Sequence, residues 1–301
     1  MPMTGRAAQT LVNPQNGNLA FKLFSFNSAD NFDHLQRNNY YSVIWLKEGE
    51  GKLKADFCEY EFQKDTLFAF SPYQPFMMYD TNGVAGYAIC FHQDFFCIHK
   101  HQEEVACNGL LFNNIYEPPF TPVDAAAASS FEHLLEQMRG ELQNGGLAQA
   151  ELLVSYLKIF LITACRLRLE KLPTLQKHEP EKKEPFILKD LKRAIEINFK
   201  TKHSASHYAD ILNISTKALG RITKFHFNKS LTHLISERIM IEAKRELYLT
   251  NKTVKEIAYQ LGYDDEYYFS RFFKVNADVS PQLYRETVGF VRAENIMAAA
   301  G

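Results

Sequence analysis

The chain has 301 residues, of which 46% are hydrophobic and 23% are charged, a composition sufficient for ordinary globular cores and for two domains. Its net charge of −1 hides an asymmetry, because residues 186–290 hold 17 Lys and Arg against 12 Asp and Glu, whereas residues 1–185 hold 16 against 22. An acidic first part and a basic second part are typical of a nucleic-acid-binding module attached to another domain.

Cysteine usage and hydropathy exclude two classes of protein. The five cysteines form an odd, widely spaced set, which argues against a secreted scaffold held by disulfides. The N-terminal segment lacks the apolar core of a signal peptide, and the sequence has no run of about 18 apolar residues that would cross a membrane. We therefore expect a soluble, cytoplasmic protein, and we assign residues 291–301 no role.

Short strands are predicted for residues 18–123, which we expect to form one domain. The β-forming segments are residues 40–46, 52–57, 60–62, 67–70, 76–79 and 84–91. The predicted breaks between them are residues 47–51, Asp65, Pro72, Pro75 and Asn82-Gly83. Several short strands at this spacing indicate a sandwich or a small barrel.

A helix pair is predicted next, over residues 124–172. The first helix ends at Gly145-Gly146, and the second, residues 147–172, carries a long apolar stripe. Two interpretations of the stripe remain open, because packing on the strands and pairing of two subunits need the same apolar face. The residues predicted to pair two subunits are Leu153, Leu157, Phe160 and Leu161.

A polar, proline-bearing linker is predicted at residues 173–185, followed by a helical domain at residues 186–290. Its first helices are residues 186–199, 206–212, 216–226 and 230–249, and Ser215 is placed to cap the third. Thr253 and Glu256 then form a capping box, and Gly262 ends that helix.

The last predicted helix, residues 266–274, begins after Asp264 or Asp265 as its cap. At about 100° per residue its aromatic half and its polar half separate. The aromatic half holds Tyr268, Phe269, Phe272 and Phe273, and the other half holds Glu266, Tyr267, Ser270, Arg271 and Lys274. Two short helices joined by a tight turn are a helix-turn-helix, and the domain holds two such units bridged by residues 230–249.

The second unit resembles the signature of the AraC/XylS family of bacterial transcription regulators. The matching residues are Ile257-Ala258, Gly262-Tyr263, Asp265, Tyr268-Phe269, Arg271, Phe273-Lys274, Ser280-Pro281 and Tyr284-Arg285. The sequence departs from the family at Asp278, where glycine is usual, and at Tyr267, where a small residue is common. Because aspartate tolerates the left-handed region, we expect the turn at Asp278 to be kept.

The resemblance implies an α+β protein of two domains: a cupin-like β-barrel with the helix pair, then an all-α double helix-turn-helix. It also implies a sequence-specific regulator that binds double-stranded promoter DNA, responds to a small-molecule effector in the barrel, forms a homodimer and contacts RNA polymerase if it is an activator. Its two recognition helices would enter successive major grooves about 34 Å apart. We expect no enzymatic activity and no cofactor.

The candidate DNA-binding residues lie on both recognition helices. On residues 216–226, Lys217, Arg221 and Lys224 form one stripe, opposite Leu219, Ile222 and His226, and Gly220 permits close approach of a backbone. We predict that Arg221 contacts a guanine and Lys224 a phosphate. On the second helix the candidates are Glu266, Tyr267, Ser270, Arg271 and Lys274, although Arg271 could instead brace the domain through an ion pair.

The first domain offers two further candidate sites. Tyr40, Trp45, Phe68 and Phe76 either line an effector pocket or belong to the core. A zinc site is suggested by Cys90, His92, Cys97, His99, His101 and Cys107, but their spacing matches no zinc motif, so we expect no metal. The alternatives are a cupin-type metalloenzyme fused to a DNA-binding module, and a regulator whose first domain binds only a protein.

Overall fold

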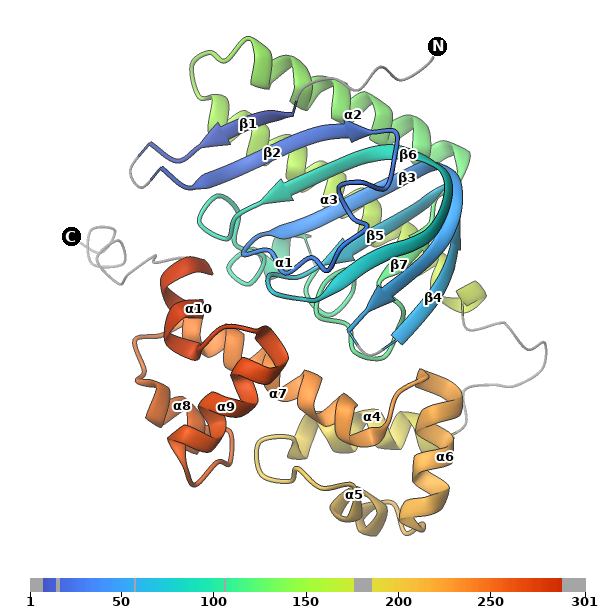
Figure 1. The fold of residues 1–301 in the computed structure, drawn as a ribbon, viewed down its shortest axis with the longest axis vertical. Coiled ribbons are helices and arrows are strands. Elements are labelled where there is room, and N and C mark those ends of the chain that lie inside the picture. The colour runs from blue at the N-terminus through green and yellow to red at the C-terminus, as the bar shows by residue number, and fades with distance from the viewer. Residues whose placement is uncertain (1–7, 15–16, 57, 106, 176–185, 289–301) are drawn as a thin grey trace. The chain divides into compact units, whose positions relative to one another are not determined.

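The computed structural model describes residues 8–14, 17–56, 58–105, 107–175 and 186–288 (Figure 1). Most of the predicted linker, residues 176–185, lies outside these ranges. The fold divides into two compact units: unit 1 comprises Met1–Asn114 and Pro118–Gln176, and unit 2 comprises Ile115–Glu117 and Lys177–Gly301. Within the part of the chain that is described, no helix combines the length and apolar character needed to span a membrane.

Unit 1 is built on one antiparallel sheet. Its strands are β1 (Gln9–Val12), β2 (Leu19–Phe26), β3 (Tyr41–Ala55), β4 (Cys58–Gln63), β5 (Thr66–Phe70), β6 (Phe76–Phe91) and β7 (Phe120–Pro122). Neighbouring strands follow the order β1-β2-β6-β3-β5-β7, and β4 pairs with β3 outside this path. One short helix, α1 (Gln102–Val105), precedes β7.

The two longest strands run through positions where the sequence predicted breaks. β3 continues through residues 47–51, and β6 continues through Asn82-Gly83, so both predicted breaks are wrong. The pairing of β3 with β6 instead shifts register three times between Leu46 and Lys52. At one shift Gly49 has φ +91°, and a Cβ there would lie 2.6 Å from the carbonyl oxygen of Asn82. Such bulges bend a strand without ending it, which explains the curved strands in Figure 1.

The sheet is curved but not closed. In the described residues its path begins at β1 and ends at β7, and these two strands do not pair with each other. The predicted α+β class, with strands and a helix pair followed by an all-helical unit, is confirmed. The cupin-like barrel is not formed as a closed structure, because both ends of the sheet stay open.

The concave face of the sheet is filled by its own side chains. The buried cluster there contains Phe26, Phe32, Ile44, Leu46, Leu53, Ala55, Phe62, Phe68, Phe70, Phe76, Met78, Val84 and Ala88. The rings of Phe70 and Phe76 stack with centroids 3.8 Å apart, and the ring of Phe62 meets Phe68 edge-on at 5.3 Å. The concave face of the sheet is therefore a hydrophobic core packed with aromatic rings.

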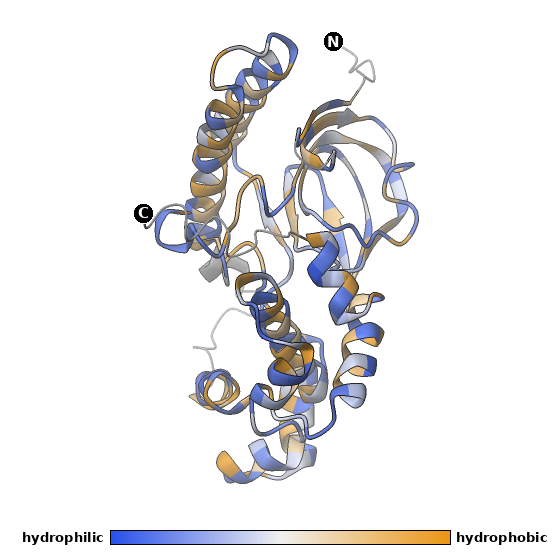
Figure 2. Ribbon diagram, turned by 90° about the vertical axis from the view of Figure 1, so that its left-hand side faces the viewer, coloured by the Kyte–Doolittle hydropathy of each residue, from blue (hydrophilic) through white to orange (hydrophobic). Residues whose placement is uncertain are grey.

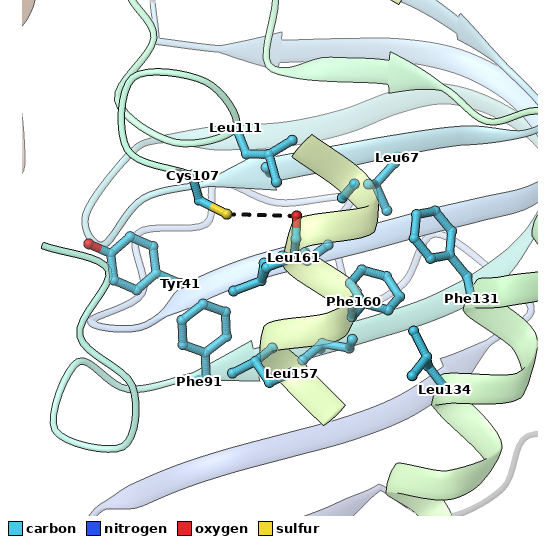
Figure 3. Packing of buried hydrophobic residues seen from close by; sticks show 14 of the residues in the cluster. Tyr41, Leu67, Phe91, Cys107, Leu111, Phe131, Leu134, Leu157, Phe160 and Leu161 are labelled. Carbon is cyan, nitrogen blue, oxygen red and sulfur yellow. Dashed lines mark hydrogen bonds between the residues drawn. The ribbon is translucent and has the colours of Figure 1, made fainter. Parts of the chain in front are cut away.

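The other face is covered by α2 (Ala125–Gln143) and α3 (Gln149–Leu175), as Figure 3 shows from close by. Asp124 begins α2 by accepting a hydrogen bond from the Ala127 amide at 3.0 Å. Phe131 of α2 stacks on Phe160 of α3 at 4.3 Å and meets Trp45 of β3 at 5.6 Å. Hydrophobic and hydrophilic residues alternate along both long helices in Figure 2, the pattern of helices that bury one side.

Unit 2 contains seven helices among the described residues. They are α4 (Phe186–Asn198), α5 (Ala205–Ile211), α6 (Thr216–Phe227), α7 (Leu231–Leu249), α8 (Val254–Gln260), α9 (Glu266–Ala277) and α10 (Pro281–Val288). The two helix-turn-helix units, α5–α6 and α8–α9, are joined by α7 as predicted. Helix α10 follows the last predicted helix and was not predicted; it begins at Pro281, and proline is well tolerated at a first helical position.

Candidate nucleic-acid interface

The second helix of each helix-turn-helix begins and ends with the same signals. Ser215 caps α6 by accepting from the Ala218 amide at 3.1 Å, and Asp265 caps α9 by accepting from the Tyr267 amide at 2.6 Å. At the other end Asn228 (φ 54°) and Asp278 (φ 65°) adopt the left-handed conformation. The expectation that Asp278 keeps the turn is therefore confirmed.

The same signals continue into the following helices. Ser230 caps α7, accepting from the His233 amide at 3.2 Å, and Ser280 caps α10, accepting from the Leu283 amide at 3.1 Å. Since α6 begins at Thr216 and α9 at Glu266, each residue of one recognition helix corresponds to the residue 50 positions away on the other. By this correspondence Arg221 matches Arg271 and Lys224 matches Lys274.

Helix α6 places its predicted DNA-binding residues in solvent. Its buried side consists of Leu219, Thr223 and Phe227, and the Thr223 hydroxyl donates to the Gly220 carbonyl at 3.1 Å. The exposed residues include all four candidates, Lys217, Gly220, Arg221 and Lys224. His226, predicted to lie opposite the basic stripe, is exposed, and Phe227, one residue later, takes the buried position at the end of the helix.

The cations of α6 are differently placed. No ion pair joins Lys217 or Arg221 to a carboxylate in the described ranges, so both leave positive charge in the first two turns. The Lys224 ammonium lies in the last turn and donates to the Asn228 carbonyl at 3.3 Å. Beside them, Phe225 is 70% exposed, a feature that the sequence pattern did not single out. The ammonium of Lys224 is thus held by a backbone carbonyl, whereas Lys217 and Arg221 extend from the first two turns.

Helix α9 exposes a mixed surface. Phe269, Phe273 and Ala277 are buried, while Arg271 and Lys274 are exposed. Tyr267 and Val275 are 78% and 79% exposed, and the predicted contacts Glu266 and Ser270 are half-exposed. Tyr268, predicted on the aromatic half, is 59% exposed, since a tyrosine can present its ring edge and hydroxyl to water. Arg271 forms no ion pair within the described residues, so the bracing role proposed for it is not observed.

Two buried carboxylates of α7, Glu242 and Glu246, form an ion network with partly exposed cations. The Glu242 carboxylate accepts from Lys200, after α4, at 3.1 Å and from Arg245 at 2.9 Å. Glu246 binds Arg245 at 2.9 Å and Lys252, before α8, at 2.7 Å. Burial raises the pKa of Glu242, but the hydrogen bonds from Arg245 and Lys200 outweigh it and lower that pKa to about 2. The network therefore ties the turn after α4 and the segment before α8 to the bridging helix α7.

Two signature residues serve the scaffold instead of the surface. Gly262 has φ +78°, and a Cβ there would lie 2.2 Å from the carbonyl oxygen of Lys200. Arg285 donates to the Leu247 carbonyl at 3.1 Å and to the Lys252 carbonyl at 2.5 Å, closing the C-terminal end of α7. The resemblance marked both positions, but these long-range contacts cannot be inferred from sequence spacing.

In unit 1, the four aromatic residues predicted to line a pocket do not share one cavity. Phe68 and Phe76 lie in the concave core, whereas Trp45 lies on the opposite face against Phe131. Successive residues of a strand point to opposite faces, so Trp45 and its neighbour Ile44 separate. Tyr40 is half-buried just before β3, and burial raises the pKa of its hydroxyl.

The residues predicted to pair two subunits are core residues of their own chain. Leu153, Leu157 and Leu161 are fully buried and Phe160 is 1% exposed, all in the cluster under the sheet (Figure 3). Of the two interpretations left open for this stripe, packing on the sheet is the observed one. No group of three His, Cys, Asp or Glu side chains that could hold a metal ion occurs among the residues described.

Unit 1 has an open groove elsewhere, between β1, β2 and the end of α2. Its volume is about 260 Å³, and it is lined by Ala8, Gln9, Leu23, Phe24, Ser25, Arg139 and Gln143. The Arg139 guanidinium lies 5.5 Å from the centroid of the Tyr87 ring. No sequence pattern indicated this groove, because its residues come from three separate segments.

Comparisons with known proteins agree on the C-terminal part of the chain. A family described as a helix-turn-helix domain matches residues 208–287. The raffinose operon transcriptional regulatory protein RafR of Pediococcus pentosaceus is 33% identical over 92 residues, covering 31% of this chain and 33% of that protein. The HTH-type transcriptional activator Btr of Bacillus subtilis is 36% identical over 80 residues, covering 27% of this chain and 15% of that protein.

The match thus spans a third or less of these two relatives. Among solved structures, ToxT from Vibrio cholerae aligns over 90% of this chain and 99% of its own, with 13% identity and a TM-score of 0.41, a distant likeness of shape. The family match covers α5 from Tyr208 and all of α6 to α9, which are the elements that carry both recognition helices. The C-terminal part of this chain is a helix-turn-helix domain of the AraC type.

Proposed function

We propose that the protein is a sequence-specific DNA-binding transcription regulator. One observation carries the proposal: two capped helices at equivalent places in a duplicated unit expose Arg221 and Arg271, neither of them held by an ion pair in the described residues. An arginine fork can bond the O6 and N7 atoms of one guanine. A guanidinium that no carboxylate neutralises keeps this capacity, whereas a paired one would first have to break its ion pair.

Position along the helix separates base contacts from phosphate contacts. In helix-turn-helix complexes the N-terminal residues of the recognition helix reach the base edges. Lys217, Gly220 and Arg221 lie in the first two turns of α6, while Lys224 lies in the last turn. We therefore assign base reading to Arg221, close approach to Gly220 and phosphate contact to Lys224. On α9 the proposed contacts are Glu266, Tyr267, Ser270, Arg271 and Lys274.

The test is a titration of the full chain on the DNA upstream of its own coding sequence and on a scrambled duplex of equal length and composition. The proposal predicts tighter binding to the upstream DNA by about a thousandfold or more at physiological salt. Equal affinity for both duplexes at every salt concentration would reduce the protein to a non-specific binder. Failure to bind either duplex would remove the proposal.

We further propose that a small anionic effector binds in the groove of unit 1. The concave face is packed with buried side chains, among them the phenylalanine rings of Phe68, Phe70 and Phe76. The groove combines an apolar wall, Leu23 and Phe24, with the Arg139 guanidinium, for which no ion pair is found in the described residues. This combination suits a small molecule with a carboxylate or phosphate at one end. Thermal unfolding of the wild type and of Arg139→Gln in the presence of carboxylate and phosphate metabolites tests it. Stabilisation of both proteins alike would contradict the proposed site.

We also propose that the protein forms a homodimer, through exposed rather than buried residues of α3. The outward side of α3 carries Leu152, Ile159 and Leu169, which are 38%, 50% and 56% exposed. Leu152 and Ile159 are one heptad apart, and Leu169 is ten residues after Ile159, so all three lie along one seam of the kind that pairs helices. We propose that two copies pair along this seam. Sedimentation of Ile159→Glu should show a monomer. A control, Leu157→Ile, changes only the buried side and should leave the association unchanged.

A further inference from the structure

Two of the five cysteines meet inside unit 1. Cys107 follows α1, and Cys165 lies on α3, 58 residues later. Their sulfur atoms are 2.9 Å apart, and the residues are 0% and 4% exposed. Their spacing in the sequence does not predict that these two cysteines pair.

The surroundings hold this pair in place. The Cys107 thiol donates to the Val105 carbonyl at 3.2 Å and lies 3.7 Å from the Leu161 carbonyl, one turn before Cys165 on α3 (Figure 3). Leu111 and Leu161 pack in the same buried cluster as both thiols. The thiols are therefore positioned by the core of unit 1 rather than by a surface loop.

The distance between the Cys107 and Cys165 sulfur atoms is only slightly longer than a disulfide bond. A disulfide has a sulfur–sulfur length of about 2.05 Å, so the two atoms need to approach by only about 0.9 Å. We expect rotation of the two side chains to supply a movement of this size. All five cysteines are free thiols in this structure, so it represents the reduced state of the pair.

We propose that Cys107 and Cys165 form a redox-modification site, which a two-electron oxidant such as hydrogen peroxide converts into a disulfide that ties the segment after α1 to α3. In the first step the Cys165 sulfur attacks peroxide, forming a sulfenic acid and releasing water. In the second step the Cys107 sulfur attacks the sulfenic sulfur, expelling the oxygen as a second water. Both thiol protons leave in these waters, two thiols are oxidised, and one peroxide is reduced.

The chemistry of the site sets the expected rate. The hydrogen bond between the two thiols and the burial of Cys107 raise the pKa of its thiol, so little thiolate is present at neutral pH. Oxidation should therefore be slower than that of an exposed cysteine. Once formed, the disulfide closes a long loop of chain and should stabilise unit 1, provided that it forms without strain.

The experiment oxidises the full reduced chain with hydrogen peroxide, blocks the remaining thiols, and identifies linked peptides by mass spectrometry without reduction. We expect one linkage, Cys107 to Cys165, together with a rise in the unfolding temperature that a reducing agent reverses. Cys165→Ser should lose both effects, and Cys90→Ser, which alters another buried thiol, should keep them.

The linked peptide in the wild type decides the matter even if Cys165→Ser folds poorly. Oxidation that links any other pair, or that leaves Cys107 and Cys165 free while the remaining thiols react, would overturn the proposal. A disulfide that lowers the unfolding temperature would overturn the claim that the pair is positioned without strain. None of these readouts depends on DNA binding, so they are separate from the proposed function.

Discussion

The two helix-turn-helix units of this protein share their end signals and differ on the face that they expose. Arg221 and Lys224 of α6 have equivalents in Arg271 and Lys274 of α9. Between them, however, Lys217 corresponds to Tyr267, Gly220 to Ser270, and Phe225 to Val275. The scaffold is thus repeated, while the contact surface is not. A duplicated unit of this kind can present two different DNA-reading faces from one rigid frame.

The difference suggests a division of labour. Helix α6 offers three cations and a glycine that lets a backbone come close, which suits guanine and phosphate contacts. Helix α9 offers the exposed side chains of Tyr267 and Val275 beside its two cations. Apolar surface in the major groove can contact the methyl group of thymine. We therefore expect α6 to favour G·C pairs and α9 to accept A·T pairs.

The largest expected effect comes from breaking the ion network of Glu242 and Glu246 on α7, the helix that bridges the two helix-turn-helix units. Glu242→Gln removes a buried carboxylate that binds Lys200 and Arg245, and it should cost about 3 kcal/mol of unfolding free energy. Both helix-turn-helix units should lose stability together, because α7 serves both. Chemical denaturation followed by circular dichroism measures this. If the variant unfolds in two separate steps and one step is unchanged, the two helix-turn-helix units are stabilised independently, and α7 does not couple them.

The same network predicts a dependence on pH. The pKa of Glu242 is about 2, below its usual value of 4.5, so its ionised form is favoured in the folded protein. Its contribution to stability is therefore complete above pH 4.5 and is lost as the pH falls toward 2. Unfolding free energies measured between these limits should fall more steeply for the wild type than for Glu242→Gln. Parallel curves would show that another group governs the acid sensitivity.

Much of unit 2 could be predicted from sequence because its determinants are local. Helix ends are set by residues within one turn, namely Ser215, the Thr253–Glu256 capping box and Gly262. Helical spacing alone predicted that Lys217, Arg221 and Lys224 share one side of α6. Unit 1 was harder. The bend at Gly49 depends on the backbone of Asn82, and the burial of Leu157 depends on a sheet whose strands are far away in sequence. Sequence periodicity reports that a face is apolar but cannot name its partner.

The next prediction concerns the left-handed residue in the turn of each helix-turn-helix. Gly262→Ala places a Cβ 2.2 Å from the Lys200 carbonyl at φ +78°, and it should destabilise unit 2 by about 3 kcal/mol. The equivalent left-handed residue of the first unit is Asn213, with φ 52°. Asn213→Ala should cost only about 1 kcal/mol, because here the backbone strain is the main cost. Equal losses in thermal unfolding would mean that the close approach at Gly262 is relieved by movement.

A smaller effect distinguishes contacts with DNA bases from contacts with DNA phosphates on α6. Arg221→Ala should weaken binding to the cognate DNA by about 1–3 kcal/mol and binding to scrambled DNA much less. Lys224→Ala should weaken both about equally and lower the salt dependence by roughly one phosphate contact. Titrations of both variants on two duplexes at two salt concentrations distinguish these outcomes. A parallel loss on both duplexes for Arg221→Ala would make Arg221 a phosphate contact and move base reading to Lys217 or α9.

The smallest effect concerns Gly220, where stability and binding should move in opposite directions. A Cβ at this position meets no atom within 4 Å, so Gly220→Ala should stabilise the helix by about 1 kcal/mol. If a DNA backbone approaches there, the added methyl group should weaken binding. Gly140→Ala on α2 of unit 1, where an added Cβ also meets no atom within 4 Å, serves as the control and should leave DNA binding unchanged. Improved stability with unchanged affinity would place Gly220 outside the interface.

The central claim is that both exposed helices of unit 2 enter DNA, and protection of guanine N7 from methylation tests it most directly. With the full chain bound to its own upstream DNA, we predict two protected regions on one face, about one helical turn or 34 Å apart. Arg221→Ala should remove protection in one region, and Arg271→Ala should weaken contacts in the other. A single protected region, or two regions that fade together in either variant, would contradict the account.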